Sequence, residues 1–550
     1  MSYINTPLFT VQNRHPEMLS SAIVMKIPHK EKLLVSLAFS IIFTIVAVAL
    51  TINWYNGMGD NATYADITLN IAKTGKPTSQ VLSTVIDYVF KENLTTITPE
   101  DISTLNLNTH HYDQNVFRFH FTPIQYLLAP FAKVIPIHIL WESLNAFSFI
   151  GILFLGYFFL RNQGTSIMDT LILLTLISSH PAWNYSIFGQ IYIDRFFFLS
   201  AALLLFSTGK NKHNSHLIFT GALISALIIE KMAIITGIFL IAYAILYWKN
   251  IRSRLRLQML FLGALLGLFA FGIIKFYLDN SYYSNFLSLS SVMNFDNYLS
   301  SYPNASQNLI VFTLVNLPLL LLGIFEWRAL IIALIMMIPN IFGNIGGAEK
   351  TGWTTHYHTT YFPFLIWAAM LGYINLQKKW LKNKSKYIFY IACLLLAIVY
   401  GNVNQLSDIS MNKASLSKAI YGSWPVRIFE ILKDSYKPTG KYRRQKQLEI
   451  VIRETIPLGS KVSVPENLII FLFQNYQVYY YPLGIDDADF IVININNNPA
   501  LPKYSGIYTF LGESNNTQID TVLFDRMIDK GYDVNHPVIY HDVAIIKRLK

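Results

Sequence analysis

The chain has 550 residues, of which 53% are hydrophobic and 14% are charged, and its mean hydropathy is +0.37. Soluble domains carry about 25% charged residues, so this composition excludes a wholly soluble protein and indicates a polytopic membrane protein. The net charge of +11 does not indicate a nucleic-acid partner, because the basic residues gather at the ends of apolar runs, as they do on the cytoplasmic face of membrane proteins. The two clearest clusters are Lys249, Arg252, Arg254 and Arg256, and Lys378, Lys379, Lys382, Lys384 and Lys386.

The N-terminal region predicts a membrane anchor. The first apolar run starts near Leu33 and is too long for the core of a cleavable signal peptide. Lys26, Lys30 and Lys32 precede it and predict an N-terminus inside. The single cysteine, Cys393, lies in another apolar run, so neither an intrachain disulfide nor a cysteine-based metal site is expected.

We expect a mainly α fold in three parts: a cytoplasmic segment at 1–32, a transmembrane helix bundle at 33–402 and an extracytoplasmic α/β domain at 403–550. The bundle should hold about 11 spans, since a span needs about 20 apolar residues and fewer where helices are broken or buried in protein. The expected spans are 33–55, 137–160, 168–179, 196–207, 217–248, 257–278, 309–325, 330–342, 361–373 and 387–400.

Two parts of this topology stay open. Residues 121–136, FTPIQYLLAPFAKVIP, either cross the membrane thinly or form a re-entrant segment. Residues 217–248 are long enough for one tilted span or for two short ones. Between the first spans, residues 56–120 form a large outer loop, in which TYADITLNIAK and SQVLSTVIDYVFKENL have the helical spacing of helices that lie flat on a membrane.

The tail after residue 403 alternates helices and strands. Helices are expected near 414–433 and 442–454, and strands at KVSVP, YQVYYYP and DADFIVINI, with a helix at ENLIIFLFQ between the first two. QIDTVLFDRMIDKG predicts an amphipathic helix that Gly531 closes, and VIYHDVAIIKRL predicts a terminal hairpin or strand pair. The tail has no phosphate loop or glycine-rich cofactor motif, so it is interpreted as a packing or acceptor-docking domain.

The outer loop carries two carboxylates, Asp60 and Asp66, just past the first span. A carboxylate at a membrane surface can act as a general base on an acceptor hydroxyl or can hold a metal or a sugar. The structural alternative is that Asp60 caps the helix that follows it. Asp66 lies inside that helix.

At the other end of the loop, Arg118 and His120 precede a Thr-Pro at the membrane entry. Arginine suits bidentate phosphate binding, and histidine can add a hydrogen bond or a proton. The alternative for Arg118 is that it only extends its charge to the membrane surface.

Two further pairs of adjacent charges lie at or inside apolar runs. Asp194 and Arg195 follow FGQIYI, and Glu230 and Lys231 interrupt the run at 217–248. Ionisable residues at membrane depth are costly, so they tend to be functional or mutually paired. Each pair could instead face water from a loop.

A third polar patch, THYHTTYFPF, places His356 and His358 just before a span. These histidines could hydrogen-bond a phosphate or sugar, or could belong to an aromatic and polar interface belt. No acidic partner has convincing metal-ligand spacing, so no metal site is expected.

These motifs resemble the GT-C superfamily of polytopic glycosyltransferases, and most closely an uncharacterised bacterial membrane-protein family of that clan. ADITLNIAKTG, HFTPIQYLLAP, IIEKMA and THYHTTYFPF are similar to its short motifs, and the segment from DADFIVINI onward is similar to its outer domain. The spacing from Asp66 to Gly75 matches the family, which favours Asp66 over Asp60 as the catalytic acid.

The resemblance implies an enzyme of the cytoplasmic membrane that transfers a sugar from a polyprenyl-phosphate donor to a glycan, lipid or protein acceptor at the outer face. Asp66 or Asp60 would be the general base, and Arg118, His120 and Arg195 or Lys231 would stabilise the departing lipid phosphate. No cofactor is expected, although a divalent cation stays open. The alternatives are a transporter or flippase for a lipid-linked or anionic solute, and a non-catalytic membrane assembly protein.

Overall fold

The computed structural model describes residues 27–57, 59–85, 107–108, 115–188, 191–208, 214–278, 305–342, 356–379, 384–403, 424–495, 504–505 and 517–549. Most of the expected cytoplasmic segment, much of the outer loop after residue 85 and the start of the helix expected near residue 414 lie outside the described residues.

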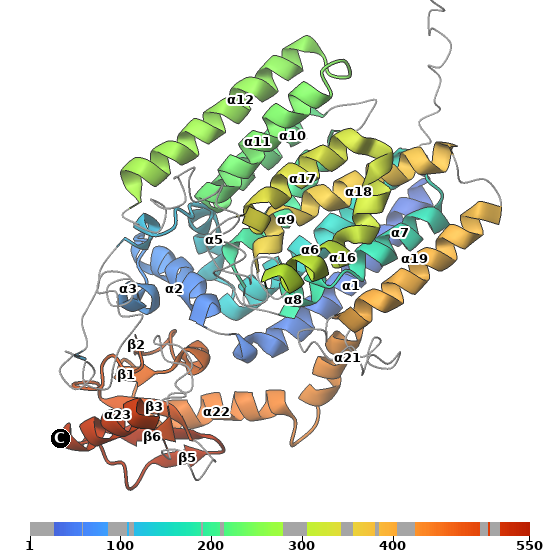
Figure 1. Cartoon of the computed structure of the whole chain (residues 1–550). Helices are drawn as coiled ribbons and strands as arrows, with labels where there is room; N and C mark the ends of the chain where they lie inside the picture. The colour runs from blue at the N-terminus through green and yellow to red at the C-terminus, as the bar shows by residue number, and fades with distance from the viewer. Residues whose placement is uncertain are drawn as a thin grey trace, which may run out of the picture.

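The fold is mostly helical, with a small sheet near the C-terminus (Figure 1). In the described part of the chain, four helical stretches are long and apolar enough to cross a membrane: His29–Asn56, Ile137–Asn162, Ser253–Tyr277 and Phe312–Ile338. They comprise α1 (His29–Asn53), α6 (Ile137–Asn162), α12 (Ser253–Gly272) and the pair α16 (Ala305–Gly323) and α17 (Trp327–Phe342). The other bundle helices are α7 (Ile167–Ser178), α8 (Ala182–Phe188), α9 (Phe197–Phe206), α18 (Phe362–Lys379) and α19 (Lys384–Val403).

The bundle has one end where basic residues meet buried acids, here called the basic end. Arg161, at the end of α6, donates to Glu31, at the start of α1, with 2.6 Å between Nε and Oε1. Lys386, at the start of α19, lies 2.9 Å from the buried Asp169 at the start of α7. The first pair joins the start of α1 to the end of α6, so these two helices run antiparallel, whereas the second joins the starts of α7 and α19, so these two run parallel.

The opposite end, here called the loop end, gathers the segments between α1 and α6. They are η1 (Trp54–Asn56), α2 (Gly59–Thr74), α3 (Gln80–Val85), η4 (Val116–Arg118) and α5 (Ile124–Ala132). Asn115 donates to the hydroxyl of Tyr277 at the end of α12, with 3.1 Å between Nδ2 and the oxygen. The segments from the expected outer loop therefore share one end of the bundle.

Residues 217–248 form two short helices, α10 (Ser215–Ile228) and α11 (Glu230–Leu246), and not one tilted helix. The extended backbone of Ile229, with φ −164° and ψ 152°, breaks the helix. The far ends of both helices meet after α9: the Asn214 N–H donates to Ser207, and the Tyr243 hydroxyl donates to Thr208. The two helices thus form a hairpin whose turn holds Glu230 and Lys231.

The segment at 121–136 is too short to cross a membrane as a helix. α5 has nine residues, which is about 14 Å of helix against a hydrocarbon core of about 30 Å. α5 packs against α2, so the HFTPIQYLLAP motif lies at the loop end of the bundle.

α2 confirms the helix expected at TYADITLNIAK, and it ends at Gly75, whose φ of 77° suits a helix C-terminus. It does not lie flat on a surface, however. Residues 61–68 of α2 are all buried, because α5 and η11 (Glu466–Phe471) pack against it. The interfacial-helix expectation for this segment was therefore wrong.

The tail forms the expected α/β domain beyond α21 (Trp424–Ser435) and α22 (Lys441–Thr455). Its six-stranded sheet has the order β2-β1-β3-β6-β5, with β4 beside β3, and mixes parallel and antiparallel pairs. The strands are β1 (Lys461–Val464), β2 (Gln477–Tyr480), β3 (Phe490–Ile495), β4 (Tyr504–Ser505), β5 (Val538–Tyr540) and β6 (Val543–Lys547), and α23 (Thr517–Asp529) covers one face. The helix expected at ENLIIFLFQ is the short η11.

The α/β domain lies at the loop end, below α2 and α3 in the view of Figure 1. Tyr55, after α1, stacks on Phe471 with ring centroids 4.8 Å apart. Gln445 of α22 donates to Asn56, with 2.7 Å between Nε2 and Oδ1. The bundle and the α/β domain therefore share one continuous core.

Glycine packing gives a test of the bundle. A Cβ on Gly237 of α11 would lie 2.7 Å from the carbonyl oxygen of Gly263 of α12. Gly237→Ala should therefore separate the helices, cost about 2 kcal/mol and lower the melting temperature in detergent. Gly267→Ala, on α12 with no atom within 4 Å of its Cβ, is the matched control. Equal melting temperatures for the two variants would contradict the close helix contact.

Candidate functional site

The turn between α10 and α11 holds the first pair of site residues. Glu230 is fully buried, and its carboxylate accepts a hydrogen bond from the Phe121 N–H at 2.9 Å. Its other oxygen lies 3.0 Å from Nδ1 of His120. The His120 side chain is 23% exposed and that of Glu230 is 0% exposed, so a ligand can reach the imidazole but not the carboxylate behind it.

A second pair repeats this arrangement. Lys231 donates to Asp194 of η5 (Ile193–Phe196), with 3.0 Å between Nζ and Oδ2. The Lys231 side chain is 27% exposed and that of Asp194 is 2% exposed. In both pairs the acid is therefore buried and the hydrogen-bond donor faces outward.

The buried charges continue into the bundle through Arg195, which is 1% exposed. Its charge interacts with that of Glu142 on α6, and Glu142 also accepts a hydrogen bond from Asn145 at 3.3 Å. We refer to His120, Glu142, Asp194, Arg195, Glu230 and Lys231 as the polar cluster. The cluster has as many acids as potential cations, as buried charges require.

Two buried histidines lie beside the cluster. His358 belongs to η9 (His356–Thr360), which contacts η5. His180, which precedes α8, interacts electrostatically with His358 and packs against Phe362 with ring centroids 4.5 Å apart and the rings tilted by 39°. The His356 backbone lies in the same turn. The expected THYHTTYFPF patch therefore faces the same region as η5.

The start of α2 also reaches the cluster. Asn61 is buried and accepts a hydrogen bond from the Ile191 N–H at 2.6 Å, three residues before Asp194. Gly57 and Gly59 allow this approach: a Cβ on Gly57 would lie 2.3 Å from the Asn61 amide, and one on Gly59 would lie 2.0 Å from the Tyr480 hydroxyl. Asp60 is the second residue of α2, between Gly59 and Asn61.

Asp66 has a different environment. Its carboxylate accepts hydrogen bonds from the Ser79 hydroxyl at 2.8 Å, the Gln80 N–H at 3.1 Å and the Asn70 amide at 3.3 Å. These contacts join α2 to the start of α3. Burial raises the pKa of Asp66 to about 6, against the opposing effect of the hydrogen bonds. Asp66 therefore has a pKa suited to a general base, and its carboxylate also holds the start of α3 against α2.

The structure brings together His120, Asp194, Arg195, Glu230, Lys231 and His358, which lie far apart in the sequence. Arg118, in η4, has an exposed side chain two residues from His120. Sequence reasoning missed Asn61, Glu142 and His180. Glu142 and His180 are ionisable residues inside or beside apolar runs, the signal that identified Glu230, but Asn61 has no comparable signal.

Gln125, in the first turn of α5, is a further missed residue. It is fully buried, and in the described part of the chain neither its amide nitrogen nor its amide oxygen has a hydrogen-bond partner. Among the residues that the structure describes, no group of three His, Cys, Asp or Glu side chains is placed to hold a metal ion.

The raised pKa of Asp66 predicts a pH-dependent effect of Asp66→Asn. The folded protein binds the Asp66 proton more tightly than an unfolded chain does, so this group stabilises the fold at low pH. That contribution is lost as the pH rises from about 4 through about 6. Asn retains an oxygen acceptor for Ser79 and carries no charge, so the variant should gain about 3 kcal/mol relative to wild type between pH 4 and pH 7.

Thermal melting of both proteins across this pH range measures the difference. Asp66→Ala, which removes the acceptor as well as the charge, is the control for the hydrogen bonds. A difference between wild type and Asp66→Asn that does not change with pH would contradict the raised pKa.

No protein-family model matches the chain, and a search of curated proteins found no match. The chemistry of the chain's own residues therefore carries the functional inference.

Proposed function

We propose that the chain is a GT-C-type membrane glycosyltransferase that moves a sugar from a polyprenyl-phosphate donor to a glycan, lipid or protein acceptor. The observation that carries the proposal is the polar cluster, in which His120 and Lys231 face outward while the acids that hold them, Glu230 and Asp194, are buried. Donors held rigidly in this way suit the stabilisation of a departing phosphate.

The membrane orientation follows from the two ends of the bundle. The basic end lies in the cytoplasm, because the basic clusters at 249–256 and 378–386 belong to helix junctions at that end. Eleven helices then cross or enter the membrane: α1, α6, α7, α9, α10, α11, α12, α16, α17, α18 and α19. The loop end and the α/β domain consequently lie outside the cytoplasmic membrane.

The lipid phosphate binds at His120 and Lys231, with Arg118 near the entrance and Arg195 adding positive charge from inside. The acceptor oxygen attacks the anomeric carbon of the sugar while a carboxylate takes the acceptor proton. The bond from that carbon to the phosphate oxygen breaks, and polyprenyl phosphate leaves with the electron pair.

We favour Asp60 over Asp66 as the general base. Asp60 is adjacent in sequence to Asn61, which contacts the segment that carries Asp194 and Arg195, whereas the oxygens of Asp66 bind the start of α3. Asp66 is then a positioning residue, although its pKa of about 6 also suits a base.

The transporter alternative has one specific observation in its favour. The break at Ile229 places a helix start inside a hairpin of two short helices, and transporters use broken helices of this kind at their binding sites. The two proposals differ in whether a glycosidic bond forms.

The full chain, reconstituted in vesicles with a polyprenyl-phosphate hexose labelled in the sugar, distinguishes them. Glycosyl transfer to added glycan or lipid acceptors, with release of polyprenyl phosphate, is expected. Lys231→Met should lower the transfer rate by about 100-fold, because a phosphate donor is lost. Lys231→Arg should recover part of the rate, and Lys249→Met, which changes an exposed lysine at the basic end, should leave it unchanged.

The base is tested in the same assay. Asp60→Asn should lower the rate by at least about 100-fold, and Asp66→Asn by less. Full activity of Asp60→Asn would contradict the assignment of the base. Movement of labelled lipid across the vesicle membrane without any sugar transfer would favour the transporter.

A further inference from the structure

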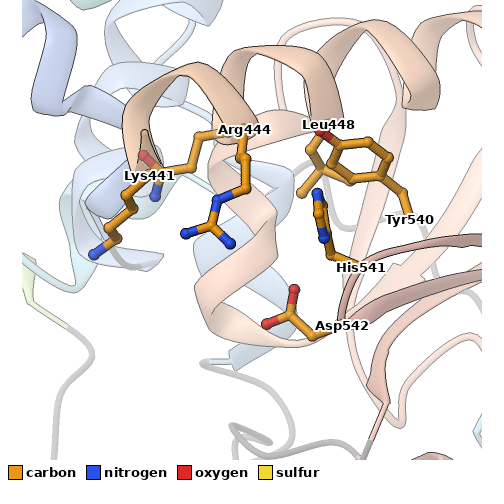
Figure 2. A pocket seen from close by; sticks show the side chains of 7 residues that line it. Lys441, Arg444, Leu448, Tyr540, His541 and Asp542 are labelled. Carbon is orange, nitrogen blue, oxygen red and sulfur yellow. The ribbon is translucent and has the colours of Figure 1, made fainter. Parts of the chain in front are cut away.

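The α/β domain contains a cavity of about 290 Å³ between α22 and the β5–β6 hairpin (Figure 2), and no residue of the polar cluster lines it. Lys441, Arg444, Gln445 and Leu448 line it from the helix, and Tyr540, His541 and Asp542 line it from the hairpin. The Tyr540 hydroxyl donates to Gln447 at 2.9 Å and so joins the hairpin to α22. This volume lies at the lower end of the range for small-molecule sites and fits a ligand headgroup.

The cavity gathers cationic groups. Lys441 and Arg444 lie one turn apart on α22, and Figure 2 shows His541 and Asp542 facing them from the hairpin. The pKa of Lys441 is lowered by partial burial and by the positive charges of Arg427 and Arg444, against the opposing charge of Asp434. Crowded positive charges of this kind favour an anionic ligand.

The cavity also offers hydrogen-bond acceptors. The Nε2 atom of Gln445 donates to Asn56, but its buried Oε1 has no hydrogen-bond partner among the described residues. The Asp542 carboxylate lies on the opposite wall. These acceptors would repel a bare dianion but would suit a phosphodiester that also carries hydroxyl groups.

α21 places this cavity near a membrane surface. Ile428 and Ile431 of α21 are buried, while Phe429 is 67% exposed and Tyr436, just after the helix, is 83% exposed. α21 packs against α1, one of the candidate membrane spans, and leads directly into α22. Exposed aromatic side chains beside basic ones are typical of helices that lie in the membrane interface.

We propose that the cavity binds the phosphodiester headgroup of an anionic membrane lipid, with α21 lying in the interface beside it. Lys441 and Arg444 bind the phosphate, and Gln445 and Asp542 accept hydrogen bonds from the hydroxyls of a glycerol headgroup. This site is separate from the polar cluster and does not depend on the proposed transferase activity.

Lipid binding to the full chain in detergent tests the proposal. Short-chain phosphatidylglycerol should raise the melting temperature in a saturable way, whereas phosphatidylcholine of the same chain length should not. The double variant Lys441→Gln with Arg444→Gln should raise the half-saturating concentration by at least about tenfold, since it removes two charged donors. Melting without lipid checks that the variant is folded.

Arg443→Gln with Lys446→Gln is the matched control, since both residues are exposed on α22 and neither lines the cavity. The control should bind the lipid like wild type. An equal loss of lipid affinity in the two double variants would overturn the proposal, because it would show that the lipid responds to the overall positive charge of α22 and not to the cavity. Glycerol 3-phosphate is the second probe. If it raises the melting temperature at the same concentration as the lipid does, the site binds a free phosphate compound and the membrane-lipid proposal is overturned.

Discussion

The buried carboxylate of Glu230 is the constraint on which the loop end depends. It sits where α10 gives way to α11, and it accepts the Phe121 N–H and pairs with His120. An isolated charge in this environment would be costly, so the chain before α5 must stay against the hairpin. The Glu230 side chain thereby holds together the turn between α10 and α11, the segment before α5 and the outward-facing imidazole of His120.

The same logic extends along the cluster. Asp194 holds Lys231 from η5, and Glu142 provides an opposing charge for Arg195 from α6. Glu230 and Asp194 are more buried than His120 and Lys231, so the exposed side of these two pairs consists of hydrogen-bond donors, whereas Arg195 and Glu142 are both buried.

The α/β domain completes the site by close contact. Tyr480 and Glu466 approach Gly59 so closely that a Cβ there could not fit, and Tyr55 stacks on Phe471. α2 is therefore enclosed between the bundle and the α/β domain.

The sequence by itself determined the elements with strong local signals: the apolar helices, the helix ending at Gly75, the buried strand β3 and the hairpin after Val538. It also singled out Glu230 and Lys231, because charges inside an apolar run are conspicuous. Which residues and helices contact one another was decided only by the tertiary structure. Whether 217–248 folds back, which acid meets His120, and whether α2 is exposed or buried all depend on contacts between residues distant in sequence. Hydrophobic periodicity is local, so it carries no information about these partners.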